Sequence, residues 1–491
     1  MSPDVSETSA SSSCYNVAFC YLPFVANDIE GTEESFAKTV RIFEKSDAWK
    51  PMTERANYLL RYICEKYDPS FPGCQCHHYR MYGSTAIDLG IGKASAWRMN
   101  WPDSPGTLAP GDCNFVIAEV GCYAFSTSVN ILVYKLHFDT SDPLTVSTQL
   151  ALLKKVRSTR IVPANPKQAG TLSDEALGEK GGLTLLEMSE RILASAGLSP
   201  KHSFFFYANE GRERMNVLMH VEADETASEL DAEDALFYLG NCYNRSFDYD
   251  GEHTIPTRMH WASPTTAWAY SSEALACLTL PQRATSARAQ TFVTSGFRYN
   301  FLTSYQFLYL MLLHQKYEYY RLLMSIGAGE RRDRAQLERF RRELEVFRAN
   351  FVFSRVSETQ QYQYLYDMVA RELKLDEMDW DVGKPIEALR ALRREDEASK
   401  RRAEEDAERE SDRRIGIALN VFALLAGISA LFDGFEFVSG YISPVVPPAV
   451  ALLIYATIAL VVVALVFFVI RQLVKVYTTD RTDKSETKDH A

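Results

Sequence analysis

The sequence predicts a mixed α+β (α/β) soluble domain, followed by a long charged helix and two C-terminal membrane-spanning helices. Three observations support this fold class. Runs typical of β-strands alternate with amphipathic helices up to about residue 302, a segment of mixed charge with helical composition follows, and two uncharged apolar runs end the chain at 415–432 and 449–470. At about 1.5 Å per residue the apolar runs would be roughly 27 and 33 Å long, close to the hydrocarbon thickness of a bilayer, about 30 Å.

Overall composition sets limits on function. The chain has 491 residues, with 53 Lys and Arg against 64 Asp and Glu, and a net charge of −11. This net negative charge excludes a broad basic surface for binding nucleic acid, so we expect no direct nucleic-acid binding. All nine cysteines precede the apolar runs, and their odd number is consistent with free thiols in a reducing compartment.

The N-terminal segment 1–14 is rich in serine and has no apolar stretch behind a basic flank, so it predicts a short disordered leader and no secretory signal. Arg413 and Arg414 precede the first apolar run, bases also follow the second, and the segment 433–448 between the runs contains acids and no bases. The positive-inside rule therefore predicts an inner (plasma) membrane protein with both termini in the cytoplasm and an acidic loop outside.

The predicted strands of the soluble domain, 15–302, are rich in β-branched and aromatic residues: 15–24, 115–123, 129–138, 203–207, 217–221 and 268–275. Its predicted helices have apolar residues at helical spacing: 52–67, 146–158, 184–196 and 232–240.

A helical region, 303–384, is predicted next, with helices at 304–325, 331–356 and 358–373 and a break at the glycines near 327–329. Pro385 suits the first turn of a further helix. Of the 28 residues in 387–414, 19 are charged, and none is Gly or Pro. We expect a stalk helix at 385–414 that enters the first span directly, although a disordered polyampholyte would have a similar composition.

This layout resembles the CorA family of divalent-cation channels, in which a cytoplasmic α/β domain, a long stalk helix and two C-terminal spans form a homopentamer. The Gly-Met-Asn signature of that family falls here on Leu431-Phe432-Asp433-Gly434-Phe435-Glu436-Phe437, where Gly434 matches and the Met and Asn are absent. The resemblance implies a divalent cation as permeant ion. The missing signature removes the neutral oxygens that would hold a hydrated Mg²⁺.

Short segments of the soluble domain resemble, more specifically, the CorA-like proteins encoded beside type III CRISPR systems. They are Glu119-Val120-Gly121 with the strand 129–138, Leu153-Lys154-Lys155, and the run 309–317. That resemblance implies an antiviral effector whose head binds a nucleotide second messenger, such as adenylated S-adenosylmethionine (SAM-AMP), and whose pore then opens and disrupts the membrane. No further cofactor is implied.

Small residues recur along one face of the first span, at Gly416, Asn420, Gly427 and Gly434. This stripe predicts either a pore lining on a symmetry axis or a close helix–helix contact. Asp433 and Glu436 are predicted to add acidic rings at the pore mouth, although charged residues also simply mark the ends of spans.

An anionic nucleotide requires cations for its phosphates and amides for its base edge. The candidate residues are Lys154, Lys155, Arg157, Asn209, Arg212, Arg214, Arg298, Asn300 and His314. Two alternatives remain open. Cations at the end of a helix also stabilise its dipole, and His314 could lie at a contact between subunits.

Cys74, Cys76, His77 and His78 have the residue types of a metal site, but their spacing is too tight for the usual zinc geometry, so no metal site is predicted. The sequence contains no G-x-S-x-G, H-E-x-x-H or phosphate-loop motif, so we expect no enzymatic activity. Two alternatives to a ligand-gated channel remain: a divalent-cation (Mg²⁺) transporter, and a two-span anchor without a pore.

Overall fold

The structure is a computed structural model of the chain. It describes residues 15–26, 32–53, 56–100, 113–140, 142–164, 182–201, 213–223, 231–244, 258–327, 334–437, 440 and 447–486. The predicted leader 1–14, the predicted strand 203–207, and the candidate residues Asn209 and Arg212 lie outside these ranges. The chain divides into two compact units, Met1–Glu387 and Ala388–Ala491.

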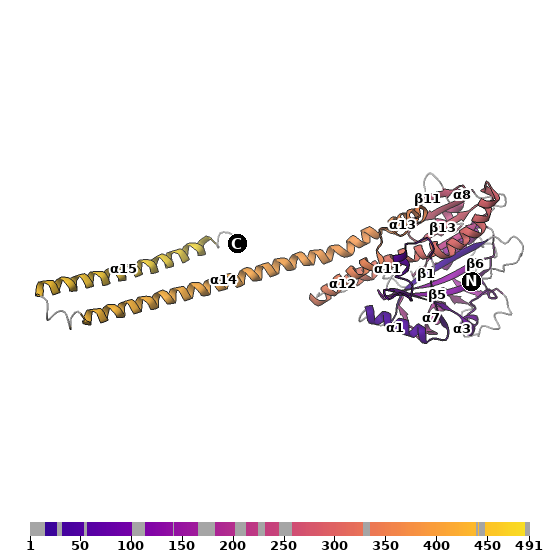
Figure 1. Ribbon diagram of the computed structural model, residues 1–491. Helices are drawn as coiled ribbons and strands as arrows, with labels where there is room; N and C mark the ends of the chain where they lie inside the picture. The colour runs from indigo at the N-terminus through magenta and orange to yellow at the C-terminus, as the bar shows by residue number, and fades with distance from the viewer. Residues whose placement is uncertain are drawn as a thin grey trace. The chain divides into compact units, whose positions relative to one another are not determined.

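A 13-stranded sheet forms the centre of the first unit, with the strand order β11-β12-β13-β10-β1-β6-β5-β4-β7-β8 (Figure 1). Off this path, β2 pairs with β3, β3 with β5, and β9 with β1. Neighbouring strands are antiparallel except for β10 and β13, which are parallel. The strands are β1 (Asn16–Ala26), β2 (Trp49–Met52), β3 (Cys76–Met81), β4 (Ala96–Asn100), β5 (Phe115–Phe125), β6 (Val129–Phe138), β7 (Arg160–Pro163), β8 (Leu183–Thr184), β9 (Pro200–Lys201), β10 (Asn216–Glu222), β11 (Arg258–Ser263), β12 (Thr266–Tyr270) and β13 (Ala274–Thr279).

The central strand β1 is buried along its whole length. Because side chains alternate across a strand, Cys20 and Leu22 join one apolar cluster, whereas Phe19 and Tyr21 join another. A strand buried on both faces reads as a continuous apolar run, as this one does. The sheet therefore has a helical layer on each side.

The first cluster contains side chains from α1 (Thr32–Lys45), α3 (Gly83–Asp88), α4 (Pro143–Leu153), α7 (Leu185–Ala194) and α8 (Ala232–Asn241). Local signals start two of these helices. The Asp142 side chain accepts hydrogen bonds from the first amides of α4, and Thr184 and Glu187 form a capping box at α7.

The second cluster contains side chains from α2 (Arg61–Cys64), α10 (Phe297–Asn300), α11 (Gln306–Gly327), α12 (Arg334–Phe351), α13 (Gln360–Glu372) and the start of α14 (Leu375–Phe437). Helical structure begins with α9 (Ala287–Thr291), so the expected boundary at 303 is too late. Two π-helical turns, Phe292–Gly296 and Phe301–Tyr305, connect α9, α10 and α11.

Two predicted elements of the first unit are wrong. The expected strand 268–275 is a hairpin, because the Ser271 side chain accepts hydrogen bonds from the amides of Glu273 and Ala274 and makes a turn between β12 and β13. Among its described residues, the expected helix 52–67 is helical at Arg61–Cys64 alone, and Met52 still pairs with β3.

Helix α14 begins at Leu375, so the predicted start at Pro385 is also wrong. The first turns of α14 place Leu375, Met378, Val382 and Ile386 in the second cluster, and this packing favours the earlier start although Pro385 lies inside the helix. The helix continues to Phe437, so the first residues of the expected loop 433–448 are helical.

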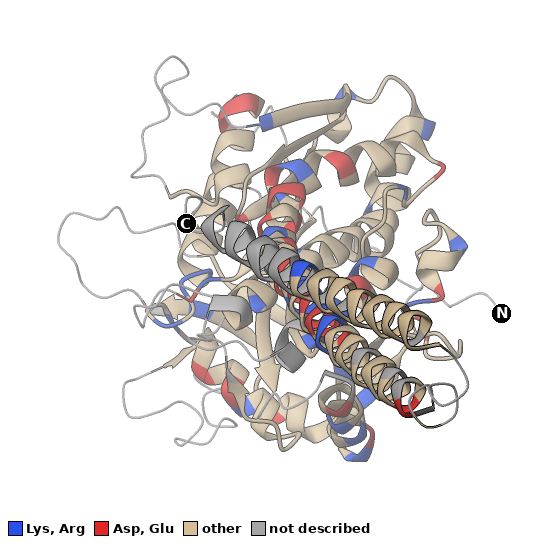
Figure 2. Ribbon diagram, turned by 90° about the vertical axis from the view of Figure 1, so that its left-hand side faces the viewer, with Lys and Arg blue, Asp and Glu red and all other residues tan. Residues whose placement is uncertain are grey.

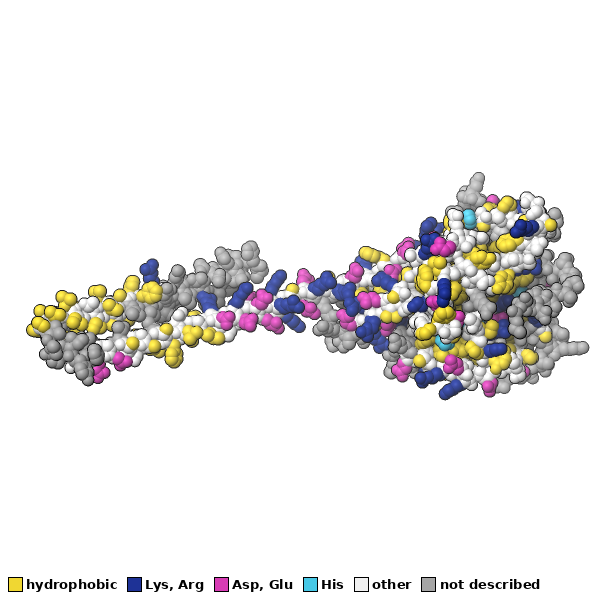
Figure 3. Space-filling view, viewed as in Figure 1, with side chains coloured by type: hydrophobic (Ala, Val, Ile, Leu, Met, Phe, Trp, Pro, Cys, Tyr) yellow, Lys and Arg dark blue, Asp and Glu magenta, His cyan; other side chains and the backbone are white. Residues whose placement is uncertain are grey.

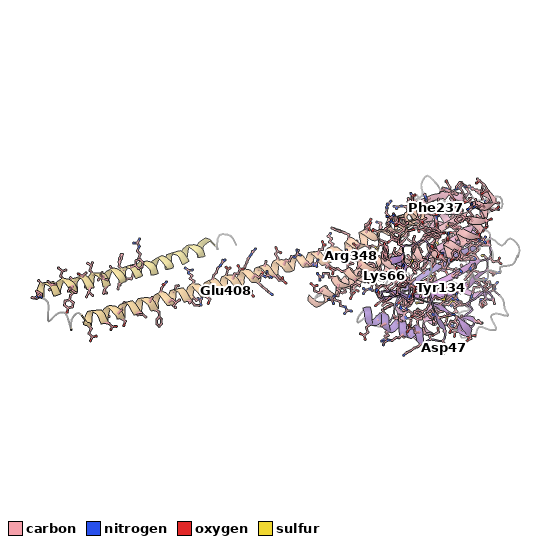
Figure 4. All side chains as sticks on the ribbon, in the orientation of Figure 1. Asp47, Lys66, Tyr134, Phe237, Arg348 and Glu408 are labelled. Atoms are coloured by element: carbon pink, nitrogen blue, oxygen red, sulfur yellow. The ribbon has the colours of Figure 1, made fainter. Side chains whose placement is uncertain are left out.

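In the second unit, α14 and α15 (Pro448–Glu486) are the long helices. Two stretches, Arg394–Gly434 and Pro448–Phe468, are long and apolar enough to cross a membrane. Apolar side chains predominate on α14 from Ile415 onward and on Pro448–Phe468 (Figure 3), and within the single chain Phe422 is 75% exposed and Leu452 is 72% exposed. The part of α14 before Ile415, which contains Glu408, has interspersed acids and bases (Figures 2 and 4).

Candidate ligand-binding site

A cavity of about 380 Å³ lies in the first unit, where four elements meet. Its walls come from the C-terminal end of α4, from Arg214 just before β10, from the C-terminal end of α8, and from the turn between β12 and β13. Three of the candidate cations, Lys154, Lys155 and Arg214, line it, so the structure brings these candidates together.

Lys154 is the C-cap residue of α4 and is buried. Its ammonium donates a hydrogen bond to the backbone oxygen of Asn241 at the end of α8, with Nζ and O 3.4 Å apart, and it forms an ion pair with Glu273. A buried lysine needs such partners, since an unpaired buried charge is costly. Lys154 therefore ties α4 to α8 and to the β12–β13 turn.

Glu273 links Lys154 to a second cation, because Arg214 forms an ion pair with the other oxygen of its carboxylate. Burial alone would raise the pKa of Glu273, but Lys154 and Arg214 outweigh burial and hold its pKa below the usual value. The carboxylate is therefore ionised at neutral pH. Sequence reasoning missed Glu273, because it lay inside what was expected to be a strand.

The β12–β13 turn is held from the other side by side chains of β10 and α11. The Asn216 amide donates hydrogen bonds to the backbone oxygens of Ser272 and Glu273, at 3.0 and 3.2 Å. Lys316 donates from Nζ to the Ser272 oxygen at 3.1 Å. Burial lowers the pKa of Lys316 to about 8, against the opposing effect of Glu273.

The cavity has an excess of positive charge. Lys154, Lys155 and Arg214 face the single carboxylate of Glu273, and among the described residues no carboxylate pairs with Lys155, which is exposed. Asn241 and Asn244 also line the cavity, and the side-chain amide of Asn241 donates to the backbone oxygen of Phe237 at 2.9 Å. This arrangement can bind a small anion and hydrogen-bond a polar group attached to it.

Arg157, although close to Lys155 in sequence, does not line the cavity. Its guanidinium makes two hydrogen bonds to the carboxylate of Glu213, whose side chain is only 2% exposed. This pair gives Arg157 a structural contact outside the cavity, and its predicted role as a ligand contact stays a prediction.

Arg298, Asn300 and His314 lie among residues of the second cluster and not at this cavity, so the structure does not bring them together with Lys154 and Lys155. Arg298 makes two hydrogen bonds to Glu222 and stacks over the ring of Tyr15. Asn300 is buried on α10.

His314 is fully buried. Its ring stacks on Phe125 with ring centres 3.7 Å apart, and Nε2 lies 2.8 Å from the Thr127 hydroxyl. Burial, with a smaller contribution from Arg321, holds its pKa well below the usual value, so the ring is neutral in the fold. His314 therefore packs α11 against the β5–β6 hairpin.

A second cavity, of about 320 Å³, lies between α11, α13 and the start of α14. Its carboxylates include Asp367, Asp376 and Asp379. Arg348, labelled in Figure 4, makes two hydrogen bonds to Asp379, and Tyr319 makes another. The acidic lining is unsuitable for a phosphate group.

The cysteines and histidines near β3 do not converge. Cys74 donates from Sγ to the backbone oxygen of Cys76, and His78 stacks on Tyr123. Across the described part of the chain, no group of three or more His, Cys, Asp or Glu side chains is arranged to hold a metal ion.

The predicted pore residues all lie on α14. At about 100° per residue, Gly416, Asn420, Gly427 and Gly434 share one face within about 40°. A Cβ atom added to any of these three glycines would meet no other atom of this chain. Because the helix continues to Phe437, Asp433 and Glu436 lie about 100° and 160° away from the stripe, so the acids and the stripe are on different faces.

Comparison of the chain with models of known protein families, with curated proteins and with solved structures gives no match. The fold and the site therefore define the class of protein. It has a mixed α/β sheet domain with a basic cavity, followed by long helices, two of which are apolar enough to span a membrane.

Proposed function

We propose that the protein is a homopentameric, CorA-like channel of the inner membrane, opened by a small nucleotide that its cytoplasmic N-terminal unit binds. One observation carries the proposal: a single helix, α14, begins within the apolar core of the sheet domain and contains the first candidate membrane span. A change in the packing of Leu375, Met378 or Val382 therefore acts on the same helix that lines the pore.

The basic cavity supports a nucleotide as the ligand. Its three cations suit phosphate oxygens, and its amides suit the edge of a base. A second messenger such as SAM-AMP, made in an antiviral response, has both features. The β12–β13 turn at the cavity contacts α11, and α11 packs in the same cluster as the start of α14. A ligand shifts the closed-to-open equilibrium by the difference in its affinity for the two states.

The stripe of Gly416, Asn420, Gly427 and Gly434 is proposed to face the pore axis. Open space around these glycines leaves room for neighbouring copies of α14. Asp433 and Glu436, at the end of the helix, would concentrate cations at the mouth without lining the narrow stretch.

Ion flux from liposomes containing the purified protein tests this function. We expect leakage of a trapped cation only after addition of the activating nucleotide, and loss of this response in Lys154→Met. Vesicles without protein, and protein with unphosphorylated nucleoside, are the controls. Leakage that does not depend on any nucleotide, or no leakage at all, contradicts the proposal, and the second result favours a membrane anchor.

The acidic end of α14 favours one alternative, a divalent-cation (Mg²⁺) transporter of the CorA family. A transporter would pass Mg²⁺ without a nucleotide and would restore growth of a transporter-deficient strain at low magnesium. The channel proposed here would do neither.

A further inference from the structure

We infer that the carboxylate of Glu273 occupies the anion position of the basic cavity, and that a ligand must displace it and so must have at least two negative charges. The inference rests on the proposed function only in taking this cavity as the ligand site. It assigns Glu273 as a specificity-determining residue and narrows the proposed nucleotide to a dianion, such as a phosphate monoester or a diphosphate, so SAM-AMP, whose phosphate is a singly charged phosphodiester, would not meet this requirement.

The contacts of Glu273 are those that a bound anion would make. One carboxylate oxygen accepts from Arg214 and the other from Lys154. The Lys154 side chain is only 6% exposed, whereas that of Glu273 is 34% exposed, so the base is built into the wall and the acid lies at the opening. Charge-assisted hydrogen bonds of this kind are the strongest that either base can make.

The carboxylate can leave without unfolding the turn that bears it. The backbone of the turn is held by Ser271, Asn216 and Lys316, through hydrogen bonds to main-chain atoms of residues 272–274. None of these bonds uses the Glu273 side chain. Rotation of that side chain toward solvent therefore exposes Lys154 and Arg214 while the cavity wall stays in place.

The number of negative charges on a ligand determines whether it can displace the Glu273 carboxylate. A monoanion that replaces the carboxylate only exchanges one negative charge for another, and it also loses the advantage of a group already tethered at the site. A dianion keeps Lys154 and Arg214 paired and adds an interaction with Lys155, which has no carboxylate partner among the described residues. The cavity therefore discriminates against singly charged anions.

Calorimetric titration of the full-length protein in detergent with pyrophosphate and with dimethyl phosphate tests the inference. We expect the wild-type protein to bind pyrophosphate and to bind dimethyl phosphate too weakly to measure. In Glu273→Gln, pyrophosphate should bind about tenfold more tightly, and dimethyl phosphate should become measurable. Glu119→Gln is the matched control, because Glu119 is similarly exposed and is paired with Arg80 outside the cavity.

Unchanged or weaker pyrophosphate binding in Glu273→Gln would overturn the inference and leave Glu273 as a residue that shapes the turn. Equal binding of the two probes by the wild-type protein would also overturn it, and that result does not depend on any variant folding. Binding is measured without a membrane potential or flux. A protein that shows the expected probe selectivity but no nucleotide-dependent leakage would refute the channel and leave the role of Glu273 standing.

Discussion

The Tyr317 hydroxyl on α11 donates a hydrogen bond to the side-chain oxygen of Asn216 on β10, and the Asn216 amide donates to the β12–β13 turn. All three elements are joined through this one buried amide. Asn216 thereby connects the wall of the basic cavity to the helix that packs beside the start of α14.

Replacing Tyr317 with Phe tests that connection. The variant leaves a buried acceptor on Asn216 without its Tyr317 donor, so the free energy of unfolding should fall by about 1–2 kcal/mol. We expect pyrophosphate affinity within about threefold of wild type and a clear loss of nucleotide-dependent flux. Denaturant unfolding, calorimetry and liposome flux measure the three quantities. Tyr299→Phe, at an exposed hydroxyl, is the control, and full flux in Tyr317→Phe would show that the hydrogen bond is not needed for gating.

Substitutions of Arg157 and Lys155 should have different effects, one on protein stability and the other on ligand binding. Arg157→Met removes the partner of the buried Glu213 carboxylate and should cost about 2 kcal/mol of stability, less than a fully buried pair because the Arg157 side chain is 41% exposed. It should leave pyrophosphate affinity unchanged. Lys155→Met should do the opposite, with unchanged unfolding and affinity several-fold weaker. Loss of affinity in Arg157→Met at intact stability would return Arg157 to the ligand site.

Buried histidines should make the stability of the first unit sensitive to acid. Burial, with a smaller effect of Arg298, lowers the pKa of His220 to about 3, and its Nε2 lies 2.8 Å from the Thr279 hydroxyl. In the unfolded state His220 binds a proton near pH 6.5, whereas in the native state it stays neutral until about pH 3. The free energy of unfolding is therefore unaffected by His220 above about pH 6.5 and falls as pH decreases from 6.5 toward 3.

Urea unfolding of the full chain in detergent at pH 7.5, 6.0 and 5.0 measures this loss. His220 should contribute about 1.4 kcal/mol per pH unit below pH 6, and His314 should add to it in the same direction. His220→Gln keeps a polar side chain that does not titrate, so its profile should be shallower by that amount. Parallel profiles for the variant and wild type would show that His220 is protonated in the native state.

The glycine stripe predicts a steric block. Gly427→Leu adds a large side chain where this chain has open space, so a single copy should tolerate it. If copies of α14 surround an axis on that face, flux should fall by at least tenfold while membrane insertion is unchanged. Ser429→Leu places the same side chain about 160° away and is the control. Equal flux in both variants would remove the stripe from the pore.

Much of the sheet could be predicted from the sequence, because β1, β5, β6 and β10 are rich in apolar residues, with aromatic and β-branched residues among them, and most of their residues are buried. The hairpin at Ser271 could not, since the apolar residues of β12 and β13 mask a turn that depends on one serine hydroxyl. The start of α14 was misplaced because Pro385 is also favourable in a first turn. Tertiary packing of Leu375 and Met378 instead favours a start at Leu375.

The candidate site was predicted only in its local part. Lys154 and Lys155 are adjacent in the sequence, so their clustering was visible there. Arg214 and Glu273 are brought beside Lys154 by the parallel pairing of β10 with β13, which no local pattern indicates. His314 and Arg298 have the residue types of a ligand site, but type alone does not distinguish a buried structural contact from a binding contact.

The double coverage of β1 has a consequence for synthesis of the protein. This strand leaves the ribosome first, yet one of its covering layers, α11 to α14, begins about 280 residues later. At roughly 5–20 residues per second, one apolar face of the strand waits about 15–60 s for its cover. The nascent chain therefore carries an aggregation-prone surface throughout most of its translation, and chaperone binding should concentrate on residues 16–26 until α11 emerges.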